Sequence, residues 1–375
     1  MVSNYPSDTA YAWWLMEHFW VTLARRFSQA SRKVYLAYPE ITSLPETISA
    51  SPIEPVELQL PWQTPTQARS ARNFIRKNNI SYIYFTDQPY FNTKYAMMRL
   101  NGVNRIIIHD HTPGDRPPAC GLKGMLKAIQ NTLPWFTADS MLCVSDLMRQ
   151  RNMSNARVPA RKCVVVQNGI SPVECLRGKN TGLKESLEVR PDSFLVVTTG
   201  RAHPYKRFDF IIECAAALRS MAPELDAVFL LAGDGVSIPE LRNQIRRLNL
   251  EDSVRLLGLR NDVHKLLCAS DLAIHAALGE GFSLSIVEYM SAGLPVLVPD
   301  IPSVSQAVHH NVTGLLYPKD EVDTAASYIQ ALATDKDRRL AMGKAAKTEA
   351  DSHYSLEQCI QSFIIAIEKG YCLHF

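Results

Sequence analysis

Two glutamates stand eight positions apart in the stretch EGFSLSIVE, residues 280–288. Two carboxylates about 5–10 Å apart across one bond carry out glycoside hydrolysis, so Glu280 and Glu288 raise the question of an acid/base pair. The residues around them argue against it. Gly279 and Gly281 place Glu280 in a flexible turn rather than on a rigid element.

A helix is predicted to begin near Leu284, with Ser283 as its N-cap and Glu288 on its second turn. The free N–H groups of that first turn attract an anion. The spacing therefore predicts a ligand laid along the loop, with Glu280 at one end, Glu288 at the other, and the amides of 282–284 facing an anionic group. The alternative is that Glu288 is an ordinary surface residue of the helix.

A cationic pattern stands in TTGRAHPYKRFD, residues 198–209. Gly200 and Arg201 directly follow an apolar run, and Lys206 comes five residues later. A glycine at a strand end permits a tight turn, and an arginine fork with a lysine point charge suits a diphosphate. The alternative is a solvated loop with ordinary surface cations.

Two further loops follow apolar runs. AGDG, residues 232–235, is a common turn sequence and supports a phosphate-side loop only weakly. GLRND, residues 258–262, precedes a helix that Asn261 or Asp262 would cap. The backbone of this second loop is also able to pair with the edge of a base.

The first half of the chain has one cluster of this kind, in IIIHDHTPGDRP at 106–117. His109, Asp110 and His111 come where a strand ends, and two histidines flanking an aspartate there favour a functional role over a structural one. Three neighbouring residues on an extended chain splay apart, so the sequence does not predict a metal site.

These side chains must be positioned by alternating strands and helices, which predict an α/β fold with parallel sheets. The predicted strands are 33–37, 81–85, 105–109, 140–144, 163–166, 194–199, 227–232, 253–257, 272–275 and 295–298. The predicted helices are 11–29, 65–78, 122–131, 145–151, 207–220, 238–248, 261–269, 284–292, 321–333, 336–351 and 355–370.

Each half of the chain has the pattern of a doubly wound unit, which binds ligands at the carboxyl ends of its strands. We expect an acceptor-side domain over 1–180 and a second domain over 181–375, with the helix at 355–375 able to pack back on the first. The polar stretch 171–193 is the expected linker. Only residues 1–4 are available as a first strand.

Composition excludes several classes. A net charge of +3 is too small to indicate nucleic acid as a partner. The eight cysteines have no CxxC spacing, which favours reduced thiols over a disulfide framework or a zinc site. No apolar run reaches the roughly 20 residues that span a bilayer, and no signal peptide is evident, so a cytoplasmic location is expected.

Taken together, the motifs resemble those of the retaining glycosyltransferases of family 4. The resemblance rests on Gly200-Arg201 with Lys206, AGDG, GLRND, the E-x7-E pair and the following AGLPV, which cover about 190–317. VVVQNGI at 164–170 resembles the end of that family's first domain. The resemblance implies the GT-B fold, two Rossmann-like doubly wound domains facing across a cleft.

The resemblance also implies roles in binding a nucleoside-diphosphate sugar. Arg201 and Lys206 would hold the diphosphate, Glu288 the ribose and Glu280 the transferred sugar. The remaining donor contacts would come from Gly200, Leu259, Arg260, Gly281, Phe282, Ser283 and Leu284. His109 and Asp110 match the family's His-Asp pair, with His111 as an alternative register. No cofactor or metal is expected.

One departure concerns the first loop, where many family members carry glycines. YPSDTAYA stands there instead, so Ser7, Asp8 and Thr9 would cap the first helix or touch the acceptor. The aromatic-rich YAWWLMEHFW that follows is predicted to pack in the core; the alternative is a surface that stacks on a sugar or faces a membrane. Arg116, Lys123 and Lys127 add a basic strip, which is compatible with peripheral attachment to an anionic membrane.

The predicted function is hexosyl transfer with retention to a hydroxyl of a sugar, lipid-linked or small-molecule acceptor, in glycan, polysaccharide or glycolipid biosynthesis. With no side chain placed as a nucleophile, the leaving phosphate is expected to help deprotonate the acceptor. An epimerase or hydrolase on the same fold and a non-catalytic sugar-nucleotide-binding protein are the alternatives.

Overall fold

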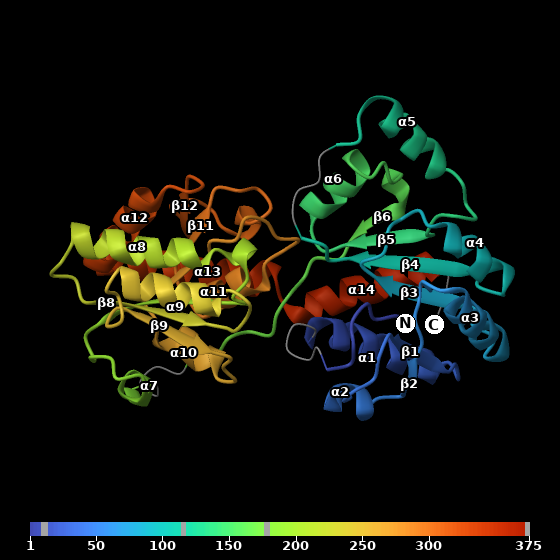
Figure 1. Ribbon diagram of the computed structural model, residues 1–375, viewed down its shortest axis with the longest axis horizontal. Coiled ribbons are helices and arrows are strands. Elements are labelled where there is room, and N and C mark those ends of the chain that lie inside the picture. The colour runs from blue at the N-terminus through green and yellow to red at the C-terminus, as the bar shows by residue number, and fades with distance from the viewer. Residues whose placement is uncertain (9–13, 114–117, 176–180, 372–375) are drawn as a thin grey trace. The chain divides into compact units, whose positions relative to one another are not determined.

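The computed structural model describes residues 1–8, 14–113, 118–175 and 181–371 (Figure 1). The chain forms two compact units, Met1–Asn168 with Glu357–Phe375, and Gly169–Leu356. The second unit begins before the expected boundary at 180, because the linker's first residues already bond to it. The amide of Ile170 donates to the Tyr354 carbonyl at 2.9 Å, and that of Val173 donates to Ser291 Oγ at 2.9 Å.

The first unit is built on a parallel sheet. Its strands are β1 (Val34–Tyr38), β2 (Ile53–Glu57), β3 (Tyr82–Thr86), β4 (Arg105–Asp110), β5 (Ser140–Cys143) and β6 (Cys163–Val165). Between β1 and β3, Val2 makes parallel bridges to Ala37 and Phe85. Val2 thus occupies the position of a first strand and joins the pair β2-β1 to the four strands β3-β4-β5-β6.

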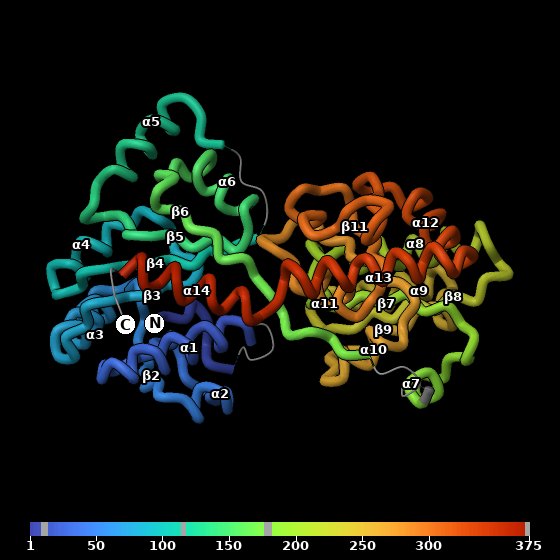
Figure 2. The backbone as a smooth tube through the Cα atoms, turned by 180° about the vertical axis from the view of Figure 1, so that it is seen from behind, coloured from blue at the N-terminus to red at the C-terminus, as the bar shows by residue number. Residues whose placement is uncertain are grey.

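Helices cover both faces of this sheet, as in a doubly wound fold (Figure 1). They are α1 (Trp14–Gln29), α2 (Glu46–Ser49), α3 (Pro65–Lys77), α4 (Thr93–Leu100), α5 (Gly121–Gln130), α6 (Asp146–Ser154) and α14 (Leu356–Tyr371), with a short 3-10 turn at Ala160–Lys162. The view from behind shows α14 running along β3 and β4 (Figure 2). Its buried Phe363 ring lies 4.5 Å from that of Phe19 and 5.7 Å from that of Tyr84.

The aromatic stretch at the start of α1 supplies core side chains. Phe19 and Trp20 are buried, as are the other inward-facing positions of the helix. The prediction of a packed helix is therefore confirmed from Trp14 onward, and residues 11–13 of that stretch lie outside the described ranges.

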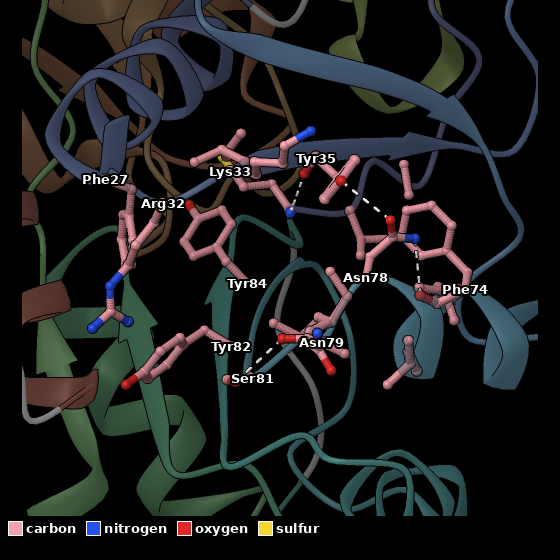
Figure 3. Close-up of a pocket in the computed structure, with 18 of the residues that line it drawn as sticks. Phe27, Arg32, Lys33, Tyr35, Phe74, Asn78, Asn79, Ser81, Tyr82 and Tyr84 are labelled. Carbon is pink, nitrogen blue, oxygen red and sulfur yellow. Dashed lines mark hydrogen bonds between the residues drawn. The ribbon is translucent and has the colours of Figure 1, made fainter. Parts of the chain in front are cut away.

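A cavity of about 380 Å³ lies between the amino-terminal halves of β1 and β3, next to Val2 (Figure 3). Val34, Tyr35, Tyr82 and Tyr84 are among the residues that line it, and Tyr35 Oη donates to Asn78 Oδ1 at 3.2 Å. Most of these residues lie in the amino-terminal halves of their strands. The cavity is therefore away from the carboxyl edge, where α/β sheets bind ligands.

The second unit has a sheet of parallel strands in the order β12-β11-β10-β7-β8-β9. The strands are β7 (Phe194–Thr199), β8 (Ala227–Ala232), β9 (Val254–Gly258), β10 (Leu272–Ile274), β11 (Val296–Pro299) and β12 (Gly314–Tyr317). The order reverses between β7 and β10. In doubly wound sheets that reversal opens a crevice at the carboxyl ends of the two strands.

The connecting helices of this unit are α7 (Thr181–Ser186), α8 (Phe208–Met221), α9 (Ile238–Arg247), α10 (Val263–Ala269), α11 (Leu284–Ser291), α12 (Val322–Thr334) and α13 (Lys336–His353), with 3-10 turns at Pro204–Lys206 and Ser305–Ala307. The predicted fold class, two Rossmann-like α/β units, is confirmed. β2 and β12 were not predicted. β2 carries Pro55 with glutamates on an exposed surface, which are residues disfavoured in strands.

Two cysteines contradict the prediction of reduced thiols. Cys175 and Cys268 form a disulfide across 93 positions of sequence. Cys175 lies on the segment that leads into the second unit, and Cys268 lies on α10. Sequence spacing does not reveal the pair because only the fold brings that segment against the helix.

Candidate functional site

Three loops that the sequence singled out meet at the carboxyl edge of the second unit's sheet. The Gly200 amide donates to the Ala232 carbonyl at 3.0 Å, and the Gly233 amide donates to the Gly258 carbonyl at 2.8 Å. Gly233 has φ +149°, and a Cβ there would lie 1.7 Å from the Gly200 carbonyl oxygen. Only glycine fits this close backbone approach.

An ion pair joins the loops that follow β7 and β10. These are the two strands between which the strand order reverses, here called the switch point. Lys206 follows β7, Glu280 follows β10, and Lys206 Nζ lies 2.5 Å from Glu280 Oε1. His275, the residue after β10, places Nε2 3.1 Å from the same oxygen. Because a carboxylate only accepts hydrogen bonds, the imidazole must donate here. Glu280 Oε2 has no partner among the described residues.

Burial and charge set the protonation states of this cluster. Burial alone would raise the pKa of Glu280, but Lys206 and His275 lower that pKa to about 2. Burial opposes the charge of Lys206, yet Glu280 outweighs it and raises the Lys206 pKa. Burial lowers the pKa of His275 against the pull of Glu280. A fixed ammonium, a fixed carboxylate and a neutral imidazole therefore stand together at physiological pH.

Arg201 contrasts with Lys206. Its side chain is exposed, and it makes no hydrogen bond or ion pair with any residue in the described ranges. Gly200, with φ +150°, lies between the end of β7 and Arg201 and turns the chain there. The guanidinium retains its donors for a ligand.

The start of α11 presents unused amides. Ser283 is the N-cap and makes no capping hydrogen bond with its side chain. The N–H groups of Phe282, Ser283 and Leu284 donate to nothing that the structure describes. Gln306 Nε2 donates to the Gly281 carbonyl at 3.0 Å and holds this loop. An anion at this helix start would meet both free donors and the helix dipole.

Glu288 lies on the same helix, and its carboxylate has no hydrogen bond or ion pair among the residues described. Burial raises the pKa of Glu288 from its ordinary 4.5 to about 7. An enclosed carboxylate without a partner costs folding free energy, and its presence points to a ligand that supplies donors.

The loop at 258–262 is organised by its own side chains. Arg260 donates to both oxygens of Asp262, at 2.8 and 2.7 Å. Asp262 is the N-cap of α10, as one of the two predicted alternatives, but makes no capping hydrogen bond with its side chain. Leu259 is 66% exposed, so the backbone of 259–260 is accessible.

In the first unit, His109 and Asp110 have partners that hold them in place. His109 is fully buried, and its Nδ1 lies 2.6 Å from Tyr84 Oη. Burial, and then the neighbouring His111, lowers the His109 pKa. Asp110 pairs with Arg151 at 3.2 Å and accepts from Asn152 at 2.8 Å.

His111 differs from its neighbours in its hydrogen bonding. Its side chain is 19% exposed, but both ring nitrogens are buried, and neither has a hydrogen-bond partner in the described part of the chain. The nearest carboxylate oxygen, on Asp87, is 3.9 Å from Nδ1. Burial lowers the pKa of His111 to about 4, although Asp110 acts in the opposite direction. The imidazole is therefore neutral near pH 7.

A cavity of about 360 Å³ lies beside this strand end; it has polar and apolar walls and is here named the polar cavity for its charged and amide groups. Its lining includes Asp87 and Thr112 from the loops after β3 and β4, Asp110 at the end of β4, and Lys127 and Asn131 from α5 and its end. Carboxylate, hydroxyl, amide and ammonium groups line it together, so the cavity suits a ligand rich in hydroxyls.

The remaining predicted residues lie near the start of the chain. Ser7 is buried, and its Oγ accepts from the Thr42 amide at 3.0 Å. Asp8 is exposed. Thr9 lies outside the described residues.

The structure thus brings Arg201, Lys206, Glu280 and the start of α11 to one edge of the second sheet, and the histidines to one edge of the first. The sequence analysis did not identify His275 as a site residue. The feature that could have identified it is its position, a polar residue directly after the apolar run LAI. No group of three His, Cys, Asp or Glu side chains gathers as a metal site in the described ranges.

Comparison with known families covers nearly the whole chain. The family described as "Glycosyl transferases group 1" matches residues 180–349, and the family described as "Glycosyltransferase Family 4" matches residues 16–174. The two matches fall on the second and first units in turn.

Individual proteins are similar at low identity. The UDP-Gal:alpha-D-GlcNAc-diphosphoundecaprenol alpha-1,3-galactosyltransferase of Escherichia coli is 28% identical over 56% of this chain and 57% of its own length. The N-acetylgalactosamine-N,N'-diacetylbacillosaminyl-diphospho-undecaprenol 4-alpha-N-acetylgalactosaminyltransferase of Campylobacter jejuni is 26% identical over 71% of this chain and 70% of its own. The chain spans about three fifths of the length of the first curated relatives it matches.

Among solved structures, the HepE protein of Anabaena in complex with UDP superposes with a TM-score of 0.74 at 19% identity. The superposition covers 97% of this chain and 99% of that protein. At this identity the likeness shows the fold.

Proposed function

The chain belongs to glycosyltransferase family 4, and from that premise we propose that it transfers a sugar from a nucleoside-diphosphate sugar to a hydroxyl of a lipid-linked saccharide, with retention at the anomeric carbon. The observation that carries the proposal is the cluster at the switch point of the second unit. It combines an unpaired arginine, a buried Lys206–Glu280 pair and free amides at a helix start. UDP is favoured as the leaving group because HepE, a structural neighbour, was solved with UDP.

The diphosphate would bind where the donors converge. The Arg201 guanidinium supplies a planar set of N–H donors that no described residue occupies. The amides of 282–284 supply further unused N–H groups. Lys206 uses one of its protons on Glu280 and has two left. These groups would stabilise the negative charge that grows on the leaving phosphate.

The nucleoside would extend along α11 and the loop at 258–262. Glu288 would accept hydrogen bonds from the ribose hydroxyls, which satisfies a carboxylate that has no partner in the free protein. The base would contact the backbone of Leu259 and Arg260. The Arg260 side chain is less suited to this contact because its guanidinium already donates to Asp262.

Glu280 would orient the transferred sugar with one oxygen. Its Oε1 is fixed by Lys206 and His275, whereas Oε2 remains available for a sugar hydroxyl. The ion pair therefore acts as a rigid support for a hydrogen bond to the substrate. His275 is a positioning residue, because it acts through Glu280.

The transfer step needs no protein nucleophile. The bond from the anomeric carbon to the phosphate oxygen breaks, and a bond to the acceptor oxygen forms on the same face. The acceptor proton passes to the departing phosphate, whose charge the cations and amides stabilise.

The acceptor would use the polar cavity of the first unit, next to Asp87 and Thr112. His111 is favoured over His109 as the histidine that meets the reacting sugar. The His111 side chain is 19% exposed and both its ring nitrogens lack a partner, although they are buried. His109 is fully buried against Phe19 and Phe363, and its Nδ1 is bonded to Tyr84. The lipid carrier is favoured by the two bacterial relatives whose names include a diphosphoundecaprenol acceptor.

The test is a panel of UDP-, GDP- and ADP-sugars incubated with the protein, with and without a short-chain polyprenyl-diphospho-sugar. We expect one UDP-sugar to give UDP release that the acceptor accelerates, and NMR of the product to show the anomeric configuration of the donor. Free sugar released as fast as transfer would indicate a hydrolase. Binding without turnover for every donor and acceptor would indicate a non-catalytic binding protein, and an inverted product would overturn the front-face mechanism.

A further inference from the structure

Exposed apolar side chains are concentrated on one short segment of the first unit. Sixteen large hydrophobic residues in the described ranges are exposed, and six of them fall within residues 122–135. These six are Leu122 (67%), Met125 (56%), Leu126 (52%), Ile129 (54%), Leu133 (42%) and Trp135 (52%). Such a concentration on a protein surface marks an interaction site.

The first four of these residues form a single stripe on α5, here named the α5 apolar face. Leu122, Met125, Leu126 and Ile129 follow the spacing i, i+3, i+4 and i+7, which places them on one side of a helix. A helix of a globular protein normally turns such a stripe toward the core. Here the stripe faces solvent.

The opposite side of α5 holds the helix to the unit. Asn131 Nδ2 donates to the carbonyls of Ala156 and Arg157 at 2.7 and 3.0 Å. Lys127 Nζ donates to the Asn155 carbonyl at 3.2 Å.

The segment that leads into the helix completes this attachment. A Cβ at Gly124 would lie 2.3 Å from the Ala119 carbonyl oxygen, and that oxygen accepts from Arg157 Nη2 at 3.2 Å. The small and polar side is therefore turned inward and the apolar side outward. Both overall views show α5 at the periphery of its unit, beyond α6 (Figures 1 and 2).

The segment that carries the α5 apolar face has charges of one sign. Residues 118–138 contain Lys123 and Lys127 and no Asp or Glu. Lys123 is exposed on the flank of the stripe, whereas Lys127 lies on the inward side. Leu, Met and Ile with a nearby Trp135 and a flanking lysine are typical of helices that lie in the headgroup region of anionic bilayers.

We propose that the α5 apolar face inserts into the surface of an anionic lipid bilayer. A second copy of the chain fits less well, because a symmetric pairing of two such faces would bring the two copies of Lys123 close together. A bilayer buries the apolar stripe and pairs Lys123 with a lipid phosphate at the same time. The proposal concerns binding by the first unit and does not depend on the proposed sugar transfer.

One consequence connects this surface to the polar cavity. Lys127, Gln130 and Asn131 line that cavity from the inward side of the same helix or its end. Seating the outward side of α5 in a membrane would therefore hold the cavity close to the headgroups.

The test is co-sedimentation of the full chain with vesicles of phosphatidylcholine, alone or mixed with phosphatidylglycerol. We expect binding to the mixed vesicles, and at least tenfold weaker partitioning for the double variant Leu126→Ser with Ile129→Ser. The matched control is Val312→Ser with Leu340→Ser, two residues of similar exposure (55% and 58%) in the second unit. It should bind as the unchanged protein does. Lys123→Glu should weaken binding only when phosphatidylglycerol is present.

Three results would overturn the proposal. One is failure of the unchanged protein to bind the mixed vesicles, and another is equal binding by the double variant. The third is self-association in sedimentation equilibrium that the double variant abolishes, without vesicle binding. Thermal unfolding of the same samples, followed by circular dichroism, monitors folding, and the double variant should keep the melting profile of the unchanged protein because the substituted side chains are exposed.

Discussion

Replacing Glu288 by glutamine should make the protein more stable and impair its binding of nucleotide. The Glu288 side chain is half-buried, its carboxylate has no partner among the described residues, and burial raises its pKa from 4.5 to about 7. That difference corresponds to about 3 kcal/mol between the two protonation states. Water at the partly exposed side chain reduces the value toward about 2 kcal/mol.

The direction in which this stability difference changes with pH follows from proton binding. Between pH 4.5 and 7 the folded state holds a proton at Glu288 that the unfolded chain has lost, so this group's contribution to stability falls as pH rises through that window. The histidines with lowered pKa act in the opposite direction, but they are common to both proteins and cancel in the comparison. The gain from glutamine should therefore be absent near pH 4.5 and complete at pH 8.

Differential scanning calorimetry of both proteins across this pH range measures the effect. For a unit of this size, 2 to 3 kcal/mol corresponds to an increase of roughly 4 to 12 °C in the melting temperature of the second unit at pH 8. Glu240→Gln is the matched control, since Glu240 is exposed on α9, and it should leave the melting temperature unchanged.

The same variant should bind UDP roughly 10- to 100-fold more weakly, the effect of removing a charged acceptor from ribose hydroxyls. For the unchanged protein, affinity for UDP should rise with pH up to about 7, because the bound form needs the ionised carboxylate. An unchanged melting temperature at pH 8, or an unchanged affinity for UDP, would refute the role given to Glu288.

Three further substitutions probe the rest of the site. Arg201→Ala should lower kcat/KM for transfer about 10²- to 10³-fold without changing the melting temperature, because the guanidinium contacts no described residue. Gly233→Ala should destabilise the second unit by about 3 kcal/mol or more in calorimetry, since its Cβ would meet the Gly200 carbonyl. Lys206→Met should cost about 3–5 kcal/mol by leaving Glu280 buried without its cation, and adding Glu280→Gln should restore most of that stability but not transfer.

Each substitution has a control in the chain. Arg247→Ala, at the far end of α9, should leave transfer unaffected, and equal losses for both arginines would remove the assignment of Arg201. Gly182→Ala has open space around its Cβ and should be tolerated; equal tolerance at Gly233 would show that its loop does not need the close approach. Failure of the double variant at Lys206 and Glu280 to regain stability would mean that the pair's loss is not electrostatic.

Much of the second unit could be predicted because its chemistry follows strand ends. Gly200, Lys206 and Glu280 each come shortly after an apolar run, and parallel strands bring their carboxyl ends to one edge. Which partner each side chain takes was not predictable. His275 reaches Glu280 through a turn whose path depends on packing, and the Cys175–Cys268 disulfide joins segments that only the tertiary fold brings together.

Less of the site in the first unit could be predicted from the sequence. The sequence identified the strand end at His109–His111, but the different surroundings of the two histidines, on which the proposal for His111 rests, come from the tertiary fold. The helix over 122–131 was predicted from its periodicity, yet periodicity does not say toward which side an apolar stripe turns. Contacts of Gly124 and Asn131 with their neighbours fix that orientation.

The most direct test of the donor site is a crystal structure of the protein with a bound UDP-sugar. We expect the diphosphate within hydrogen-bond distance of the Arg201 guanidinium and of an amide between 282 and 284. We also expect the ribose hydroxyls on Glu288 and a sugar hydroxyl on Glu280 Oε2. A nucleotide bound elsewhere, with these groups unoccupied, would contradict the central claim that the switch point of the second unit holds the donor.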